Sequence, residues 1–241
     1  PVFNIQGKSE GTLKKGKWNG PFKTFYENGQ LQEEGTYKDG KLDGPYRDYY
    51  DNGQLESERT YKDGEQDGQV KYYHDNGQLS SEETFKDGKL DGPYKWYNDN
   101  GQLEEEGTYK DSEKISVKEF GYYQNGKIQS EKTYKNGQPD GLWKSYYDNG
   151  QLEGEGTFKD GNQYGPFKFY YDNGQLQLLE NYENNEQHGP YKLYHQNGQL
   201  MYEGTSKDGK QDGVTKFYDK NGKLKNESTY EDGKLIDSKE Y

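Results

Sequence analysis

The chain has 241 residues, of which 26% are hydrophobic, whereas a typical globular domain has about 45–50% apolar residues when glycine is counted. Aromatic residues make up 16%, more than a disordered chain carries, so we expect a thin folded structure that buries one face of many tyrosines. The formal net charge of −12 disfavours binding to nucleic acid and direct docking on anionic membranes.

The sequence contains no cysteine, which excludes disulfides and thiolate metal sites. It also has no run of about 18 apolar residues, so no membrane-spanning segment is predicted. Because residue 1 is Pro and Phe3-Asn4-Ile5 already resembles a strand, we expect a processed or trimmed chain that has lost any export signal with its start. The localisation is therefore open between the cytoplasm and export.

Residues 3–13 end in Glu10-Gly11-Thr12-Leu13, which matches the second strand of the unit that follows, so the array is predicted to begin on a half repeat. The tetrapeptide Asn-Gly-Gln-Leu then recurs at a spacing of 24 residues, with one step of 25. The seven identical copies and two conservative variants stand at Asn28–Leu31, Asn52–Leu55, Asn76–Leu79, Asn100–Leu103, Asn125–Ile128, Asn149–Leu152, Asn173–Leu176, Asn197–Leu200 and Asn221–Leu224. Self-similarity at a short fixed period indicates a repeat array, so residues 1–241 are predicted to form a single array of nine repeats.

The unit from Gly44 to Asp67 shows what each repeat encodes. Asn52-Gly53 and Asp63-Gly64 are strong signals for two-residue type I′ hairpin turns, which need positive φ at both central residues. The runs between the turns are rich in Tyr and Thr, which favour a pleated strand. Each repeat is therefore predicted to be two antiparallel strands and two turns, with helix excluded almost everywhere.

A two-residue turn at Asn52-Gly53 places Tyr50 opposite Leu55 and Arg47 opposite Glu58. Because the period is even, every repeat then presents equivalent residues on the same face. One face is predicted to carry Tyr46, Tyr50, Leu55 and Tyr61. The other is predicted to carry Arg47, Tyr49, Glu58 and Thr60. The position of Arg59 is often glycine, which leaves room for a ring to lie over the backbone (Gly35, Gly107, Gly156 and Gly204).

Opposite charges are predicted to face each other across the strands of seven repeats. The pairs are Lys23/Glu34, Arg47/Glu58, Lys71/Glu82, Lys95/Glu106, Lys144/Glu155, Lys192/Glu203 and Lys216/Glu227. Each exposed pair is worth only about 0.2–1 kcal/mol, so the main effect of this charged rung is to disfavour slipped registers.

The fifth repeat, at residues 111–124, is irregular. Asp111–Val117 lacks both the Asp-Gly and the Gly-Pro signals and holds the extra residue, so a bulge, kink or loop is predicted within residues 111–119. The chain then closes with Gly233–Ile236 and a charged tail. The predicted fold class is all-β: an elongated, twisted, mostly single-layer antiparallel sheet of about nineteen strands, on the order of 90 Å long at ~4.8 Å per strand.

The segments Tyr-Tyr-Asp-Asn-Gly-Gln-Leu, Glu-Gly-Thr-Tyr-Lys-Asp-Gly-Lys and Asp-Gly-Pro-Tyr-Lys resemble the variant MORN repeats of bacteria, including those of proteins described as antitoxin components of toxin–antitoxin systems. The resemblance covers about Gly7 to Tyr230. It implies a non-catalytic scaffold that engages proteins, and the wider family has also been linked to phospholipid. Repeat five departs from the pattern, as does repeat seven at Leu178-Leu179.

Residues suited to catalysis or metal binding do not converge in the sequence. His74 and His195 occupy the repeat position of Tyr50, and His188 replaces a turn aspartate, so we interpret the histidines as substitutes rather than a site. Acidic runs such as Glu104–Glu106 have no predicted buried setting that would raise a pKa. Hairpin geometry explains the turn Asp and Asn residues better than calcium binding does. We therefore predict no enzyme activity, no cofactor and no metal.

Positions where the repeat tolerates both polar and apolar residues are the candidates for partner contact. At the position of Asp48, the large apolar members are Tyr72, Trp96, Phe169, Leu193 and Phe217. A second predicted cluster consists of Leu178, Leu179, Leu193, Met201 and Tyr202, in which Leu179 replaces the glutamate opposite Lys168. Clustered apolar and aromatic side chains on a surface are typical of protein interfaces.

We therefore predict a non-catalytic repeat scaffold that binds a protein partner, as a toxin-neutralising or surface interaction module. Glycan or cell-wall binding through aromatic ladders is an alternative, although tryptophan occurs only at Trp18, Trp96 and Trp143. A self-assembling ribbon or membrane-surface association is another, since open edge strands invite end-to-end pairing.

Overall fold

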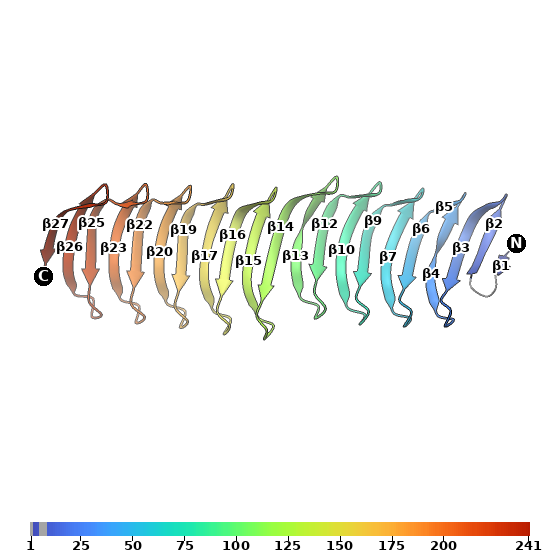
Figure 1. Cartoon of the computed structure of the whole chain (residues 1–241), viewed down its shortest axis with the longest axis horizontal. Helices are drawn as coiled ribbons and strands as arrows, with labels where there is room; N and C mark the ends of the chain where they lie inside the picture. Colours follow the sequence, from blue (N-terminus) through green and yellow to red (C-terminus); the bar gives the residue numbers. More distant parts are fainter. Residues whose placement is uncertain (1, 5–8) are drawn as a thin grey trace. The chain divides into compact units, whose positions relative to one another are not determined.

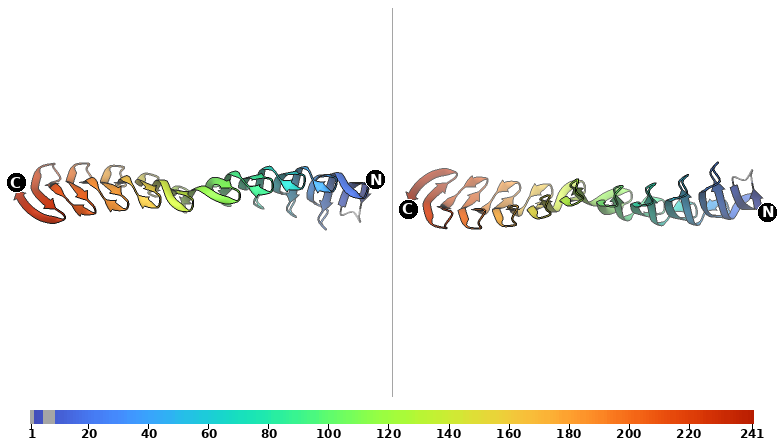
Figure 2. Two further views of the ribbon diagram at one scale, coloured as in Figure 1. Left: turned by 90° about the horizontal axis from the view of Figure 1, so that it is seen from above. Right: turned by 90° about the horizontal axis from the view of Figure 1, so that it is seen from below.

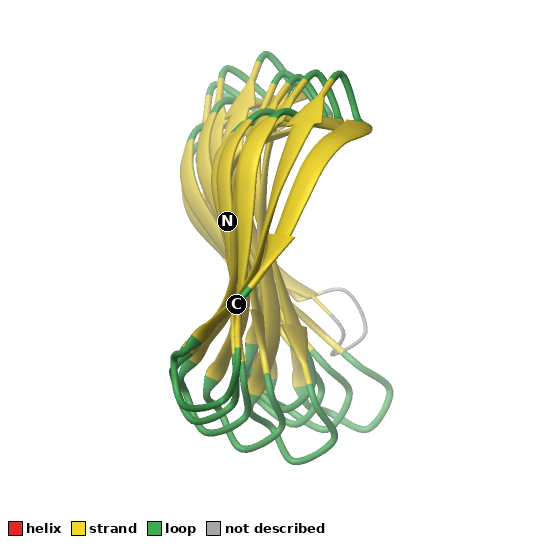
Figure 3. Cartoon of the chain, turned by 90° about the vertical axis from the view of Figure 1, so that its left-hand side faces the viewer, coloured by secondary structure: helices red, strands yellow, loops and turns green. Residues whose placement is uncertain are grey.

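The computed structural model describes residues 2–4 and 9–241, and every regular element in these residues is a β-strand (Figure 3). Ile5, predicted to lie in the first strand, is outside the described residues. The chain divides into two compact units, Pro1–Val117 (unit 1) and Lys118–Tyr241 (unit 2). Within each unit the strands succeed one another in chain order (Figure 1) and form one layer (Figure 2). The predicted all-β, single-layer sheet of hairpins is confirmed.

Unit 1 contains fourteen strands, the last of which runs across the boundary into unit 2. They are β1 (Val2–Asn4), β2 (Ser9–Lys14), β3 (Lys17–Phe25), β4 (Leu31–Lys38), β5 (Lys41–Leu42), β6 (Gly44–Tyr49), β7 (Leu55–Lys62), β8 (Glu65–Gln66), β9 (Gly68–Tyr73), β10 (Leu79–Lys86), β11 (Lys89–Leu90), β12 (Gly92–Tyr97), β13 (Leu103–Lys110) and β14 (Glu113–Tyr122).

Unit 2 continues the same alternation of long strands and short segments. Its strands are β15 (Ile128–Lys135), β16 (Gln138–Tyr146), β17 (Leu152–Lys159), β18 (Asn162–Gln163), β19 (Gly165–Tyr170), β20 (Leu176–Glu183), β21 (Glu186–Gln187), β22 (Gly189–Tyr194), β23 (Leu200–Lys207), β24 (Lys210–Gln211), β25 (Gly213–Tyr218), β26 (Leu224–Glu231) and β27 (Lys234–Glu240).

The two-residue segments exist because a bend splits one strand of the hairpin in six of the repeats, whereas β3 and β16 continue through the equivalent Gly20 and Gly141. In the second repeat, the Asp43 N–H donates to the Thr36 carbonyl (2.9 Å), and Gly44 follows with a φ of 109°. Glycine adopts this left-handed conformation without a steric penalty. Pro45, which has no N–H to contribute to a ladder, comes directly after the bend, as predicted.

The Asp-Gly turns adopt the predicted two-residue geometry. Asp63 and Gly64 have φ values of 51° and 94°, and Lys62 pairs with Glu65 across them. Positive φ at both central residues defines the type I′ turn, whose twist matches that of the flanking strands.

The Asn-Gly turns differ from the prediction. Of the two turn residues, only Gly53 has a positive φ (84°). The Gly53 N–H donates to Tyr50 O, and the Tyr50 N–H donates to Gln54 O (each 2.8 Å). The loop therefore has three residues, a type I turn followed by a left-handed glycine. Asn52 stays right-handed because its Oδ1 accepts the Gln54 N–H (2.8 Å).

A bulge on the following strand compensates for this longer loop. Tyr49 pairs with Leu55, and the next rung pairs Asp48 with Ser57, so Glu56 is the extra residue. The predicted pair Tyr50/Leu55 is therefore wrong, and Leu55 shares the face of Tyr49. Beyond the bulge the predicted register returns, with Arg47 opposite Glu58. Because the register returns in the same way in the other repeats, all seven predicted pairs of opposite charge lie opposite each other.

Side chains of the Asn-Gly turns also connect each hairpin to the next one. The Tyr50 hydroxyl donates to Tyr73 O (2.6 Å), and Asn52 Nδ2 donates to Asp75 O (3.2 Å). Equivalent tyrosine bonds recur at Tyr26, Tyr123, Tyr147 and Tyr171. Tyr50, predicted to belong to the aromatic face, thus acts as a link between hairpins.

The face that carries Tyr46 and Tyr61 (the aromatic face) provides the buried interior. Their rings meet edge to face at 5.5 Å, and at equivalent positions Tyr94 packs on Tyr109 at 4.7 Å. Phe167 contacts Phe158 and Tyr182 and is 2% exposed. Such ring pairs are worth about 0.5–1.5 kcal/mol beyond the area they bury. One layer of rings lying on the sheet therefore replaces a core between two layers.

Glycine at the position of Arg59 makes this packing possible. A Cβ added to Gly156 would lie 2.3 Å from Phe167 Cδ1, and one added to Gly204 would lie 2.4 Å from the Tyr191 hydroxyl oxygen. The predicted role of these glycines, leaving room for a ring over the backbone, is confirmed.

In the fifth repeat the bend is missing. Asp111 and Ser112 both have positive φ (49° and 70°) and form a two-residue turn, after which β14 runs without interruption to Tyr122. No glycine follows the turn until Gly121, so no residue can easily adopt the left-handed bend. This turn is the one that other repeats also have, for example at Asp87-Gly88, so it is not the predicted bulge, kink or loop. The extra residue lies in β14, which has ten residues against nine in β16.

Candidate functional site

Five consecutive long strands of unit 2 place an apolar side chain on the same rung of the aromatic face. We call Phe169, Leu178, Leu193, Tyr202 and Phe217 the apolar row; each is paired with the next across the sheet. Four of these side chains are half-buried, and Phe217 is 40% exposed. All five were predicted as contact residues, and the register brings them together.

The equivalent rung of unit 1 is mostly polar and hydrogen-bonded. Thr24 Oγ1 donates to Glu33 Oε1 (3.1 Å), and Ser57 Oγ donates to Asp48 Oδ2 (2.7 Å). The first hairpins of unit 1 therefore fold with polar residues at this rung, so a continuous row of apolar residues is not a requirement of the architecture.

The two other candidates from the position of Asp48, Tyr72 and Trp96, are each covered by a cation. The Arg59 guanidinium lies 5.4 Å from the centre of the Tyr72 ring, and the Lys114 ammonium lies 4.1 Å from the centre of a Trp96 ring. These contacts are cation–π interactions, which occupy ring faces that a ligand would need. These contacts could not be predicted from the sequence, because the cation and the ring stand on different strands.

The second predicted cluster is divided by the sheet. Leu178 and Tyr202 belong to the apolar row, whereas Leu179 pairs with Lys168 and Lys192 on the opposite face. Met201 is the extra residue of a bulge, between the rungs of Leu200 and Tyr202. Neighbouring residues of a strand point to opposite faces, so the run Leu178-Leu179 cannot form one patch.

The face that carries Arg47 and Glu58 (the charged face) holds a regular polar network. Glu155 accepts the Tyr170 hydroxyl (3.0 Å) and an ion pair from Lys168 (3.2 Å). Burial and this hydrogen bond to a carboxylate raise the pKa of Tyr170 to about 12. In the irregular repeat, Lys118 and Tyr146 hold Glu131 in the same way (2.7 and 2.6 Å). Although burial opposes it, these bonds lower the pKa of Glu131.

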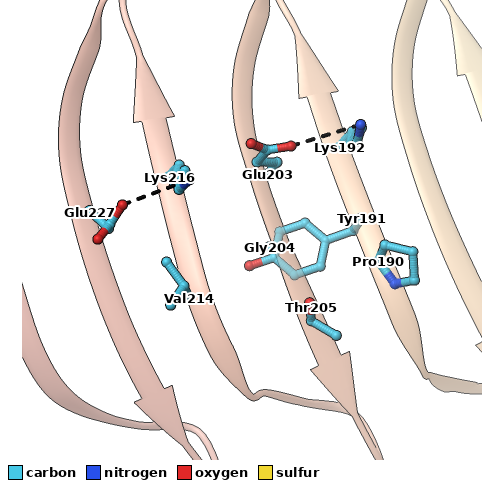
Figure 4. A pocket seen from close by; sticks show the side chains of 9 residues that line it. All are labelled: Pro190, Tyr191, Lys192, Glu203, Gly204, Thr205, Val214, Lys216 and Glu227. Carbon is cyan, nitrogen blue, oxygen red and sulfur yellow. Dashed lines mark ion pairs between the residues drawn. The ribbon is translucent and has the colours of Figure 1, made fainter.

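Shallow hollows open on the charged face beside the rung. The hollow in unit 2 has a volume of about 470 Å³, and Figure 4 shows Pro190, Thr205 and Val214 below the ion pairs Lys192–Glu203 and Lys216–Glu227, each 3.8 Å long. Hollows of about 340 and 200 Å³ lie at equivalent places in unit 1. Their recurrence makes them a product of the repeat rather than one specialised pocket.

The histidines take structural places in the hairpins. His74 Nε2 lies 3.2 Å from Tyr97 O, and His195 Nε2 lies 3.4 Å from Tyr218 O, which is the link that tyrosine makes elsewhere. Among residues 2–4 and 9–241 no group of three or more His, Asp or Glu side chains could hold a metal ion. The described part of the chain also has no helix with the length and hydrophobicity needed to cross a membrane.

A hairpin-repeat sheet with one aromatic and one charged face defines a repeat scaffold. Nine consecutive segments match the MORN repeat variant, at residues 18–39, 42–63, 66–87, 90–111, 117–136, 139–160, 163–184, 187–208 and 211–232. The chain therefore belongs to the MORN repeat variant family, a non-catalytic type of repeat.

Similarity to solved structures is weak. The crystal structure of TcdB2-TccC3-Cdc42 is 13% identical over 91% of this chain and 16% of that chain, with a TM-score of 0.24. The structure of the Photorhabdus luminescens Tc holotoxin pore is 12% identical over 92% of this chain and 14% of that chain, with a TM-score of 0.25. Comparison with curated proteins finds no match. Likeness at this level assigns no function to the chain.

Proposed function

We propose that this chain is a non-catalytic scaffold that binds a protein partner through the apolar row of unit 2. The observation that supports the proposal is the alignment of Phe169, Leu178, Leu193, Tyr202 and Phe217 on successive strands. In unit 1 polar groups are hydrogen-bonded on the same rung, and its aromatic residues Tyr72 and Trp96 are covered by cations, so an unbroken row of five apolar side chains is not required by the fold.

The energetics favour a covered row over a solvated one. Apolar surface gains roughly 25 cal/mol per Å² when it leaves water, and aromatic anchors dominate the energetics of protein interfaces. Proteins of the antitoxin type that these repeats resemble act on a protein, so a toxin is one candidate partner. The acidic net charge supports a partner that is neither nucleic acid nor an anionic membrane.

Glycan binding is less well supported. Sugars stack on open ring faces, whereas Trp143 is stacked at 6.3 Å on Phe167 and contacts Phe169 at 6.2 Å. Tyr191 and Tyr202 are likewise stacked on each other at 5.8 Å. The stacked rings of the aromatic face therefore cover one another's faces, on which a sugar would have to stack.

The test compares capture of a partner from the native host by three forms of the tagged chain. Leu193→Thr/Phe217→Thr removes the centre and the exposed end of the apolar row, and threonine is tolerated at this repeat position because Thr24 occupies it. Leu142→Thr is the matched control, because Leu142 is apolar and 59% exposed but lies opposite Thr157, outside the row.

We expect one protein in stoichiometric amount with the wild type and the control, and at least about tenfold less with the double variant, which corresponds to 1.4 kcal/mol. Equal capture by all three forms would remove the apolar row from the interface. Retention on glycan resin, or concentration-dependent filaments without a captured protein, would favour the alternatives.

A further inference from the structure

The charged rung of unit 2 is interrupted at one place. Lysine and glutamate alternate from Lys144 to Lys239 across successive strands, except that Leu179 stands between Lys168 and Lys192. With Glu131, which pairs with Lys144, the rung holds five lysines (Lys144, Lys168, Lys192, Lys216, Lys239) against four glutamates (Glu131, Glu155, Glu203, Glu227), and two of the lysines flank Leu179. This local excess of positive charge contrasts with the acidic chain as a whole.

The rung glutamate of the first hairpin is held by three donors. Glu34 accepts the Tyr49 hydroxyl (2.9 Å) and pairs with Lys23 (3.2 Å) and Arg47 (3.7 Å). The cations come from the two neighbouring strands, and the tyrosine comes from the hairpin that follows. Tyrosine bonds of the same kind recur at Tyr73, Tyr146, Tyr170 and Tyr218. Five rung carboxylates, Glu34, Glu58, Glu131, Glu155 and Glu203, thus accept both a tyrosine hydroxyl and at least one cation.

At Leu179 the donors are present and the carboxylate is missing. Tyr194 occupies the place of Tyr49, and among the described residues its hydroxyl has no hydrogen-bond partner. Among the described residues, the one ion pair of Lys168 is with Glu155 (3.2 Å) and that of Lys192 is with Glu203 (3.8 Å), each on the side away from Leu179. Both lysine side chains are about 40% exposed (42% and 40%), so the site is open to a ligand.

We propose that Lys168, Lys192 and Tyr194 bind the carboxylate of a glutamate or aspartate side chain presented by a protein partner above Leu179. Two ammonium groups and a phenol offer charge-assisted hydrogen bonds, and Leu179 provides an apolar floor for the methylene groups of the incoming side chain. The proposal rests on the proposed function in taking the partner to be a protein, but it uses the opposite face from the apolar row.

The first test measures binding of a short capped peptide that alternates glutamate and threonine, at low ionic strength, by chemical-shift titration of the full chain. A peptide with glutamine in place of glutamate is the ligand control. Leu179→Glu places in the chain the carboxylate that other repeats have, and Leu179→Gln is the matched neutral variant. We expect the glutamate peptide to perturb the strands around Leu179 and to bind Leu179→Glu about tenfold more weakly, with Leu179→Gln close to wild type.

A gain of binding gives the converse test. Glu58 is held by Arg47 (2.8 Å) and by Tyr73 (3.3 Å), so Glu58→Leu should create a second site in unit 1 and a second set of shifts. Independently of any ligand, Leu179→Glu should raise the midpoint of thermal unfolding, because it supplies an acceptor to three donors.

Equal binding of the peptide to the wild type and Leu179→Glu, or equal binding of the glutamate and glutamine peptides, would overturn the proposal. Leu193→Thr/Phe217→Thr should bind the peptide like the wild type. If the peptide binds the wild type but the double variant still captures its partner, only the apolar row is refuted as the interface. If the peptide does not bind and the double variant loses its partner, only the carboxylate site is refuted.

Discussion

Gly156→Ala tests whether a glycine beneath the aromatic rings is required for the stability of the single-layer sheet. The new Cβ would lie 2.3 Å from both Cδ1 and Cε1 of Phe167, a ring that is 2% exposed and cannot move freely between Phe158 and Tyr182. Overpacking of this kind costs about 1–3 kcal/mol. Alanine recovers about 0.5–1 kcal/mol because it restricts the unfolded chain more than glycine does. The free energy of unfolding should therefore fall by about 1–2 kcal/mol.

The assay is equilibrium unfolding in urea, followed by circular dichroism and by the fluorescence of Trp143, which stacks on Phe167. Lys132→Ala is the matched control, because Lys132 holds the same repeat position one hairpin earlier and is exposed. Its effect should stay within about 0.5 kcal/mol.

The double variant Gly156→Ala/Phe167→Leu tests the cause. If the clash is responsible, the smaller side chain relieves it, and the two substitutions together should cost about 1 kcal/mol less than their sum. Additive effects, or a Gly156→Ala protein as stable as the wild type, would refute the requirement for bare backbone beneath the ring.

Two further predictions concern pH and the turns. The pKa values of Tyr146, Tyr170 and Tyr182 are raised to about 12 by burial and by hydrogen bonds to carboxylates, so their contribution to stability is complete below about pH 10 and is lost as the pH rises through about 12. Urea midpoints should decline over that range, and tyrosinate absorbance should appear at higher pH in the folded chain than in urea; coincident titrations would contradict this. Asn52→Ala removes the acceptor of the Gln54 N–H and the donor to Asp75 O, and should cost about 1 kcal/mol. Asn52→Asp keeps the acceptor and should cost less. Unchanged amide exchange in the turns of Asn52 and Asp75 in the alanine variant would argue against a link between the two hairpins.

Much of the architecture could be predicted because the period is even and the strand faces are chemically distinct. The pairing of Arg47 with Glu58 was predicted from a two-residue turn and is correct because the bulge at Glu56 offsets the extra loop residue. The ring over Gly156 was predicted from the absence of a side chain there. The Asn-Gly turn could not be predicted in the same way. Its conformation depends on hydrogen bonds of Asn52, one of which is made to the next hairpin, and a local propensity does not contain them.

The candidate residues were predictable in part. Alternation along a strand separates Leu178 from Leu179, and applying that rule to the cluster would have placed them on different faces from the start. The apolar row follows from the predicted register, which pairs Leu193 with Tyr202 whether or not Met201 forms a bulge. The lack of a described partner for the Tyr194 hydroxyl could not be predicted, because the tyrosine–glutamate hydrogen bond joins residues that are not paired in any hairpin.

The side-chain links between neighbouring hairpins run in both directions. The Tyr50 hydroxyl donates forward to Tyr73 O, whereas the Tyr49 hydroxyl donates backward to Glu34. Melting of one hairpin would therefore remove an acceptor from the hairpin before it and another from the hairpin after it. Loss of order in a hairpin should accordingly weaken its neighbours on both sides.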